Sequence, residues 1–208
     1  MTVDSQGQQP SDVSAQLKAG LEHHQSGRFR EAEGIYQSIL KEHPQHPDAL
    51  HLMGVLALQA GRAEVGVDFF ERAVKAKPGE PEFLNMCGEA YRMLKNYDVA
   101  IDRYRQALAI RPEFAGAHNN LGNTFMELRR FDDAVACYQK AIAIDPGFPM
   151  SHNNLGIALK ELGRPQEAIA HHKQALVIMP AYAEAHSSLG NALQAMGRAE
   201  EAIAHHKQ

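Results

Sequence analysis

The chain has 208 residues, of which 44% are hydrophobic and only 7% aromatic, and tryptophan is absent. This composition favours helix over sheet, because strands prefer β-branched and aromatic residues. The 21 basic and 25 acidic residues give a formal net charge of -4, and no basic run occurs of the kind that neutralises phosphates. We therefore expect no nucleic-acid partner.

The first residues, MTVDSQGQQPSD, are polar and predict a flexible leader that ends at about Asp12. They lack the apolar core of a signal peptide, and no later segment approaches the roughly 20 apolar residues of a membrane span. We expect a soluble cytoplasmic protein with no membrane contact and no cofactor. The only two cysteines, Cys87 and Cys137, are too few for a disulfide framework or a zinc site, and both are expected to be buried.

From Val13 onward the sequence repeats every 34 residues. A glycine is followed twelve positions later by a second small residue, then four positions later by a ring, and a proline closes the unit. The glycines are Gly20, Gly54, Gly88, Gly122, Gly156 and Gly190, and the second small residues are Ala32, Gly66, Ala100, Ala134, Ala168 and Ala202. The rings are Tyr36, Phe70, Tyr104, Tyr138, His172 and His206, and the prolines are Pro44, Pro78, Pro112, Pro146 and Pro180. A fixed period of this length indicates an array of stacked units.

Each unit is predicted to be a pair of helices, because apolar residues recur at steps of three and four. In the fourth unit the helices are expected at about Ala115–Leu128 and Phe131–Ile144, and the other units follow by steps of 34. The small residues Gly122 and Ala134 are expected to let the paired helices approach closely, so a larger residue at either place would push them apart.

The turn inside each pair is predicted to need a left-handed residue, supplied by Gly27, Gly61, Gly163 and Gly197. Lys95 and Arg129 replace this glycine, which should strain those two turns by about 1 kcal/mol each. Helix starts are predicted at Pro47, Pro81, Pro149 and Pro165, because a missing amide proton is harmless in the first turn.

The lattice resembles the tetratricopeptide repeat family. Five complete repeats are expected at 13–46, 47–80, 81–114, 115–148 and 149–182, with a truncated sixth at 183–208. The resemblance implies an all-α, right-handed α–α superhelix in which the first helices line a concave channel and the second helices form the outer wall. It also implies a protein-interaction scaffold that holds a protein or peptide partner.

The segment HNNLG occurs at His118 and again at His152, and places adjacent amides in the first helix of two repeats. Positions are counted from the first residue of each repeat, so that Val13 is position 1 of repeat 1. By the family's geometry, positions 2, 5, 6, 9, 12 and 13, which lie on the first helix, face the channel, and we call these positions the first-helix face. In repeats 3 to 6 it carries Asn85, Asn119, Asn120, Asn123, Asn153, Asn154 and Asn191, together with Ser187 and Ser188. In repeats 1 to 3 apolar residues occupy comparable places, namely Leu52, Val55, Leu58, Met86 and Met93.

An asparagine side chain can pair with a peptide group whatever side chain that peptide carries. The predicted site is therefore a peptide-binding column made of Asn85, Asn119, Asn120, Asn123, Asn153, Asn154, Ser188 and Asn191. The alternative is that these amides cap or bridge neighbouring helices, or face water. The apolar residues of repeats 1 to 3 could add a hydrophobic anchor, with ordinary solenoid packing as their alternative role.

The column is similar to the one in protein O-linked N-acetylglucosamine transferases, which have asparagine at position 6. Asn120 and Asn154 match this position, Ser188 substitutes, and Lys18, Leu52 and Met86 depart. The alternative function is thus a substrate-recruiting region of a glycosyltransferase with its catalytic domain beyond Gln208. A clamp for acidic chaperone tails is rejected, because Asn119, Glu184 and Ser188 stand where its cations belong.

Twelve histidines raise the question of a metal site, but equivalent residues of stacked units lie too far apart to share an ion. His172 and His206 are interpreted as packing rings, and His171 and His205 as outer-face residues. No catalytic motif is found, so enzyme activity is not expected within the chain. No polar capping helix covers the last repeat, which predicts either a longer parent protein or self-association through this edge.

Overall fold

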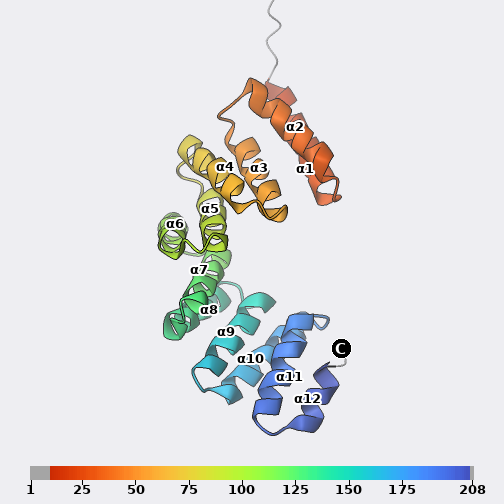
Figure 1. Ribbon diagram of the computed structural model, residues 1–208, viewed down its shortest axis with the longest axis vertical. Helices are drawn as coiled ribbons and strands as arrows, with labels where there is room; N and C mark the ends of the chain where they lie inside the picture. Colours follow the sequence, from red (N-terminus) through yellow and green to blue (C-terminus); the bar gives the residue numbers. More distant parts are fainter. Residues whose placement is uncertain (1–9, 207–208) are drawn as a thin grey trace, which may run out of the picture. The chain divides into compact units, whose positions relative to one another are not determined.

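The computed structural model describes residues 10–206, and the side chains of residues 13–202 among them. The chain forms two compact units, and the first ends at Asn96 while the second begins at Tyr97. Within the described ranges every regular element is an α-helix (Figure 1). Unit 1 contains α1 (Pro10–Gln25), α2 (Phe29–Glu42), α3 (Pro47–Gln59), α4 (Ala63–Ala76) and α5 (Pro81–Met93). Unit 2 contains α6 (Tyr97–Ile110), α7 (Ala115–Glu127), α8 (Phe131–Ile144), α9 (Pro149–Glu161), α10 (Pro165–Ile178), α11 (Ala183–Ala195) and α12 (Ala199–His206).

The helix boundaries follow the predicted period. The fourth repeat was expected to end its first helix at Leu128, and α7 ends one residue earlier at Glu127. Helix α1 begins at Pro10, three residues before the expected first repeat at Val13, so residues 10–12 are helical rather than part of a leader. Residues 1–9 of the predicted leader lie outside the described residues. Pro47, Pro81, Pro149 and Pro165 are each the first residue of a helix, as predicted.

The turn inside each helix pair contains one residue with a positive φ angle. The four glycines have φ angles of 71 to 75°, and Lys95 and Arg129 adopt φ angles of 60 and 58°. These angles confirm that each turn needs a left-handed residue and that Lys95 and Arg129 take the place of the glycine. After α7, the Arg130 N–H donates to the Phe125 carbonyl at 2.8 Å and the Arg129 N–H donates to the Met126 carbonyl at 3.0 Å. These two bonds satisfy carbonyls that the helix end leaves open.

This geometry predicts opposite effects for two substitutions in unit 1. Lys95→Gly relieves a left-handed strain of about 1 to 2 kcal/mol, and the flexibility of glycine in the unfolded chain offsets about 0.5 to 1 kcal/mol of it. Gly61→Ala introduces the same strain, and its new Cβ would meet no atom within 4 Å. Thermal unfolding should therefore show a higher midpoint for Lys95→Gly and a lower midpoint for Gly61→Ala. Shifts of the same sign would contradict the assignment.

In repeats 1, 2, 4 and 5 the glycine of the first helix lies against the ring of the second helix. A Cβ added to Gly122 would lie 2.6 Å from Cε1 of Tyr138, and one added to Gly54 would lie 2.7 Å from Cε1 of Phe70. The second small residue is close as well, because a Cβ on Gly66 would lie 3.5 Å from the Gly54 carbonyl oxygen. The predicted close approach of the paired helices is thus present, and the ring of the second helix is the nearest neighbour of Gly54 and Gly122.

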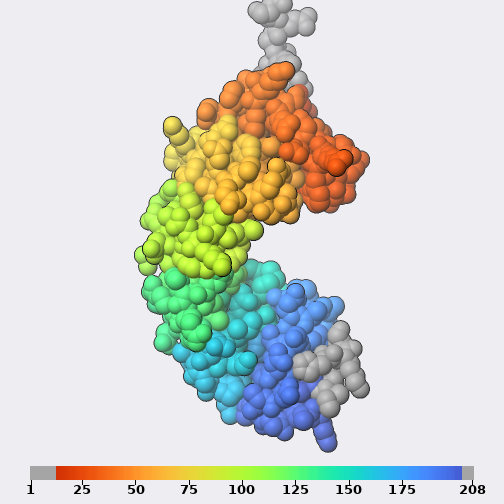
Figure 2. Space-filling model, in the orientation of Figure 1, coloured from red at the N-terminus to blue at the C-terminus, as the bar shows by residue number. Residues whose placement is uncertain are grey.

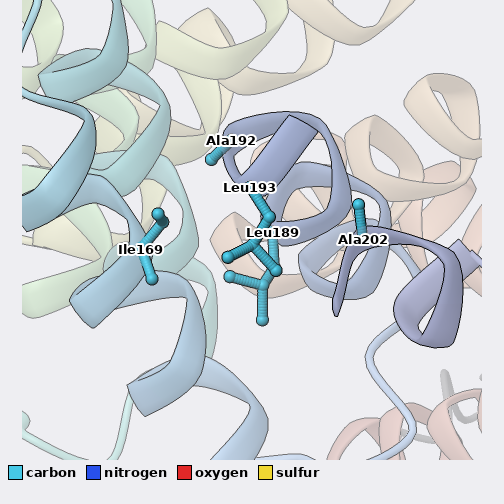
Figure 3. Packing of buried hydrophobic residues seen from close by; sticks show 5 residues of the cluster. All are labelled: Ile169, Leu189, Ala192, Leu193 and Ala202. Atoms are coloured by element: carbon cyan, nitrogen blue, oxygen red, sulfur yellow. The ribbon is translucent and has the colours of Figure 1, made fainter. Parts of the chain in front are cut away.

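Buried side chains connect each helix pair to the next. Figure 3 shows one such contact in unit 2, where Ile169 of α10 meets Leu189 and Leu193 of α11, with Ala202 of α12 on the other side. In Figure 2 the colours of unit 2 run from green to blue in chain order, so neighbouring pairs in sequence are neighbours in space. Stability in such an array comes from contacts within and between adjacent pairs.

Both cysteines are buried, as predicted. Burial raises the pKa of the Cys137 thiol to about 11, because the charged thiolate is disfavoured away from water. Among the described residues, no helix is both long and apolar enough to span a bilayer.

Candidate functional site

The predicted amide column is divided between the two units. Asn85 lies on α5 of unit 1, where its side chain is buried and only 7% exposed. The other seven residues belong to unit 2, namely Asn119, Asn120 and Asn123 on α7, Asn153 and Asn154 on α9, and Ser188 and Asn191 on α11. Helix α9 contacts both α7 and α11, so these seven residues lie on adjacent helices.

Two of the predicted contact residues are buried and bonded inside the protein. Asn119 is 6% exposed, and its Oδ1 accepts a hydrogen bond from the Ser151 hydroxyl at 3.1 Å. Asn153 is 3% exposed, and its Oδ1 accepts a bond from Nδ1 of His172 at 2.9 Å. The carbonyl groups of Asn119 and Asn153 therefore join neighbouring helices, as the bridging alternative expects.

A second set of bonds links α7, α8 and α9. The Asn154 Nδ2 group donates to Oδ1 of Asn119 at 3.2 Å and to Oδ1 of Asn123 at 3.0 Å. The Tyr138 hydroxyl donates to the same Asn123 Oδ1 at 2.8 Å. We call Asn119, Asn123, Asn154, Ser151 and Tyr138 the amide network. It fixes the side chains of two adjacent repeats relative to each other.

The amide network leaves hydrogen-bonding groups with a defined polarity. An asparagine side chain has two N–H donors and one carbonyl with two lone pairs. The Asn123 carbonyl already accepts two bonds, so its two N–H groups remain. Asn154 uses both N–H groups, so its carbonyl remains. Both side chains are half-buried, and together they present donors beside an acceptor.

The remaining predicted residues of unit 2 lie on the same helices or on α11. Asn120 and Ser188 are half-buried, and Ser187 and Asn191 are exposed on α11. Sequence reasoning missed Ser151 and the hydroxyl of Tyr138. The signal for Tyr138 was available, because a buried tyrosine hydroxyl usually finds a hydrogen-bond partner.

The histidine of HNNLG has a structural role that was also missed. The Nε2–H groups of His118, His152 and His186 each donate to the carbonyl of the proline six residues earlier, at 3.0, 3.2 and 2.8 Å. These bonds fasten each first helix to the loop that enters its repeat.

His171, which was predicted to lie on the outer face, is half-buried. Its ring stacks on His152 with centroids 5.7 Å apart, and its Nδ1 lies 3.4 Å from Nδ1 of His152. Because the Nε2 of His152 carries the hydrogen, its Nδ1 is the acceptor of this bond. No group of three or more metal-ligating side chains comes together among the described residues.

His172 confirms its predicted role as a packing ring. It is 1% exposed, and a Cβ on Gly156 would lie 2.6 Å from its Cε1. Burial lowers the pKa of His172 to about 4, with smaller contributions from the charges of His171 and Lys160. Its Nε2 is buried without a hydrogen-bond partner, so protonation would place an unpaired charge in the core. The His172 side chain is therefore neutral at pH 7.

This burial predicts acid sensitivity with a defined window. Between pH 6.5 and 4 the unfolded chain binds a proton at residue 172 that the folded chain does not, so the free energy of unfolding falls as pH falls. The loss at pH 5 is roughly 2 kcal/mol at about 1.4 kcal/mol per pH unit. Urea unfolding at pH 7 and pH 5 should show a smaller loss for His172→Phe than for the natural protein. Equal losses would contradict the prediction.

Family models match most of the chain. Models described as "Tetratricopeptide repeat" match residues 17–81, 115–148 and 148–208, and a model described as "TPR repeat" matches residues 88–128. These segments are tetratricopeptide repeats. No curated protein matches the chain.

Solved tetratricopeptide structures share the fold. The MamA protein is 25% identical with a TM-score of 0.67, over 83% of this chain and 94% of that chain. TTC0263, a thermophilic TPR protein of Thermus thermophilus, is 23% identical with a TM-score of 0.75, over 88% and 99%. PilW, a type IV pilus biogenesis factor, is 19% identical with a TM-score of 0.86, over 95% and 91%. These likenesses confirm the predicted all-α solenoid of tetratricopeptide repeats.

Proposed function

We propose that this chain is a protein-interaction scaffold and that the first-helix face of unit 2 binds an extended peptide through its main chain. The observation that carries the proposal is the defined polarity of Asn123 and Asn154. A peptide group offers one carbonyl acceptor and one N–H donor. The Asn123 N–H groups fit the carbonyl, and the Asn154 carbonyl fits the N–H.

Preorganisation supports this assignment. The bonds inside the amide network hold Asn123 and Asn154 in place before any ligand arrives. Binding then immobilises few additional rotamers, and this reduces the entropy lost on association. The tetratricopeptide repeats themselves support a protein-interaction role.

The proposed site divides the predicted residues by what surrounds them. Asn120, Asn123, Asn154, Ser188 and Asn191 are assigned to peptide contact, because each is half-buried or exposed. Asn119 and Asn153 are assigned to support, because their carbonyl groups already hold neighbouring helices. Asn85 is buried in unit 1 and is not assigned to this surface.

The glycosyltransferase alternative gains no support. Neither the matching family models nor the three solved structures named above link the chain to such an enzyme. A cytoplasmic location and self-association through the last repeat stay predictions.

The sharpest test is Asn123→Asp. The new carboxylate can still accept the bonds from Tyr138 and Asn154, but both N–H donors of the side chain are lost. We expect the affinity for a bound peptide to fall about tenfold or more, since one unmatched polar group costs roughly 1 to 3 kcal/mol. Gln139→Glu on α8 is the matched control, because it makes the same charge change at an exposed residue of a second helix.

The ligands for this test are fluorescent peptides tiled over a protein that the immobilised chain captures from cell extract, measured by anisotropy. Main-chain recognition predicts that replacing a peptide N–H by N-methyl weakens binding more than replacing a peptide side chain by alanine. Equal affinity for Asn123→Asp, or a ligand that depends only on its side chains, would overturn the proposal.

A further inference from the structure

Unit 1 has a continuous apolar hollow at the place where unit 2 has amides. A groove of about 460 Å³ lies between the inner residues of α1 and α3 and is lined by Leu21, His24, Gln25, Gly27, Phe29, Leu52, Val55 and Gln59. A second hollow of about 130 Å³ shares Phe29 and Gln59 with it and adds Arg30, Glu33, Leu56, Ala60 and Arg62. Leu21 is 40% exposed and Phe29 is 49% exposed, so large apolar side chains are open to solvent here.

The repeats show that the fold does not require this apolar lining. Position 9 of repeat 1 is Leu21, and positions 6 and 9 of repeat 2 are Leu52 and Val55. The corresponding residues of repeats 4 and 5 are Asn123, Asn154 and Ile157, and those of repeats 5 and 6 are Ile157, Ser188 and Asn191. Phe29 corresponds to Ala63 in repeat 2 and to Tyr97 and Phe131 in repeats 3 and 4, so an aromatic residue is common at this place. Both units nevertheless form the same helix pairs, so the apolar side chains of Leu21, Leu52 and Val55 are not required for that packing.

Contacts within unit 1 join the walls of this hollow. Nε2 of His24 and Oε1 of Gln59 are hydrogen-bonded at 2.8 Å, and this bond joins α1 to α3 across the groove. The His24 ring also meets the Phe29 ring edge-on with centroids 5.7 Å apart. The contact with His24 places the Phe29 ring where it lines both hollows.

The rim of the hollow carries an excess of positive charge in a chain whose net charge is -4. Arg30 and Arg62 line it together with one carboxylate, Glu33. Arg62 is only loosely neutralised, because its ion pair with Glu33 is 3.9 Å long. Arg130, Arg164 and Arg198 occupy the same repeat position and pair at 2.7 Å with a carboxylate three residues on. For Arg62 that place is taken by Val65.

We infer that this hollow binds a segment of a partner protein that carries aromatic or leucine side chains flanked by acidic residues. The large apolar side chain would lie against Leu21, Phe29 and Leu52, where burial of an aromatic ring removes apolar surface from water on both partners. The flanking carboxylates would meet Arg30 and Arg62. This inference rests on the proposed scaffold function and adds a second, chemically different subsite to it.

The test uses the whole chain and a fluorescent peptide of defined sequence, acetyl-Glu-Asp-Phe-Leu-Phe-Asp-Glu-amide. Two comparison peptides replace the three central residues by serine or the four acidic residues by lysine. Anisotropy should show at least about tenfold tighter binding of the first peptide than of either comparison peptide, because each comparison peptide loses the apolar or the charged contacts. The affinity of the first peptide should also fall as salt is raised from about 50 to about 300 mM, because salt screens the charged contacts.

Variants taken from other repeats locate the subsite. Leu21→Asn introduces the residue that repeat 4 has at Asn123, and Phe29→Ala introduces the residue that repeat 2 has at Ala63. Each should weaken binding of the acidic aromatic peptide about tenfold. Val177→Asn on α10 is the control, because this side chain is 73% exposed and lies in unit 2. Thermal unfolding of each variant checks that the fold is retained.

The two subsites are distinguished by testing the variant of each subsite with the ligand of the other. Asn123→Asp should leave binding of the acidic aromatic peptide unchanged, and Leu21→Asn should leave binding of main-chain ligands in unit 2 unchanged. The inference is overturned if the acidic aromatic peptide fails to bind, if the lysine peptide binds equally well, or if Val177→Asn weakens binding as much as Phe29→Ala. Loss of binding only in Asn123→Asp would assign the peptide to the amide surface instead.

Discussion

The contact between a glycine of one helix and a ring of its partner determines how the other residues are arranged. Gly54, Gly122 and Gly156 leave no room for a Cβ beside Phe70, Tyr138 and His172. The paired helices can therefore pack closely around a buried ring, and their remaining apolar sides must be covered by the adjacent pair. Because this contact sets the helix spacing, the first-helix face is free to differ in chemistry from repeat to repeat.

Unit 2 shows how that freedom can be used for polar residues. A buried amide is costly unless it is hydrogen-bonded, and the amide network satisfies this requirement between neighbouring repeats. The same bonds stabilise the stack and leave Asn123 and Asn154 with opposite hydrogen-bonding character. Packing and the peptide contact that we propose thus involve the same few side chains, which is why Asn123→Asp separates them better than alanine would.

Most of the fold could be predicted from sequence, because it depends on backbone rules that act within one repeat. The period placed α7 and α8 to within one residue, and the positive φ angles of Lys95 and Arg129 followed from their places in the turn. The candidate site was predicted less well. Nothing in the order of HNNLG shows that Asn119 is buried while the next residue, Asn120, is half-buried. Asn119 bonds to Ser151, which lies 32 residues away on α9, and a contact over that distance leaves no mark in the local sequence.

Within each unit, the main helix contacts among the described residues join the same repeat or adjacent repeats. A change on the first-helix face of one repeat therefore alters few other contacts, and its effect on stability decays over a short distance along the stack. Such modularity lets a lineage exchange the binding preference of one repeat without redesigning the rest. The aliphatic lining of the first two repeats and the carboxamide lining of the later ones are two outcomes that this architecture permits in a single polypeptide.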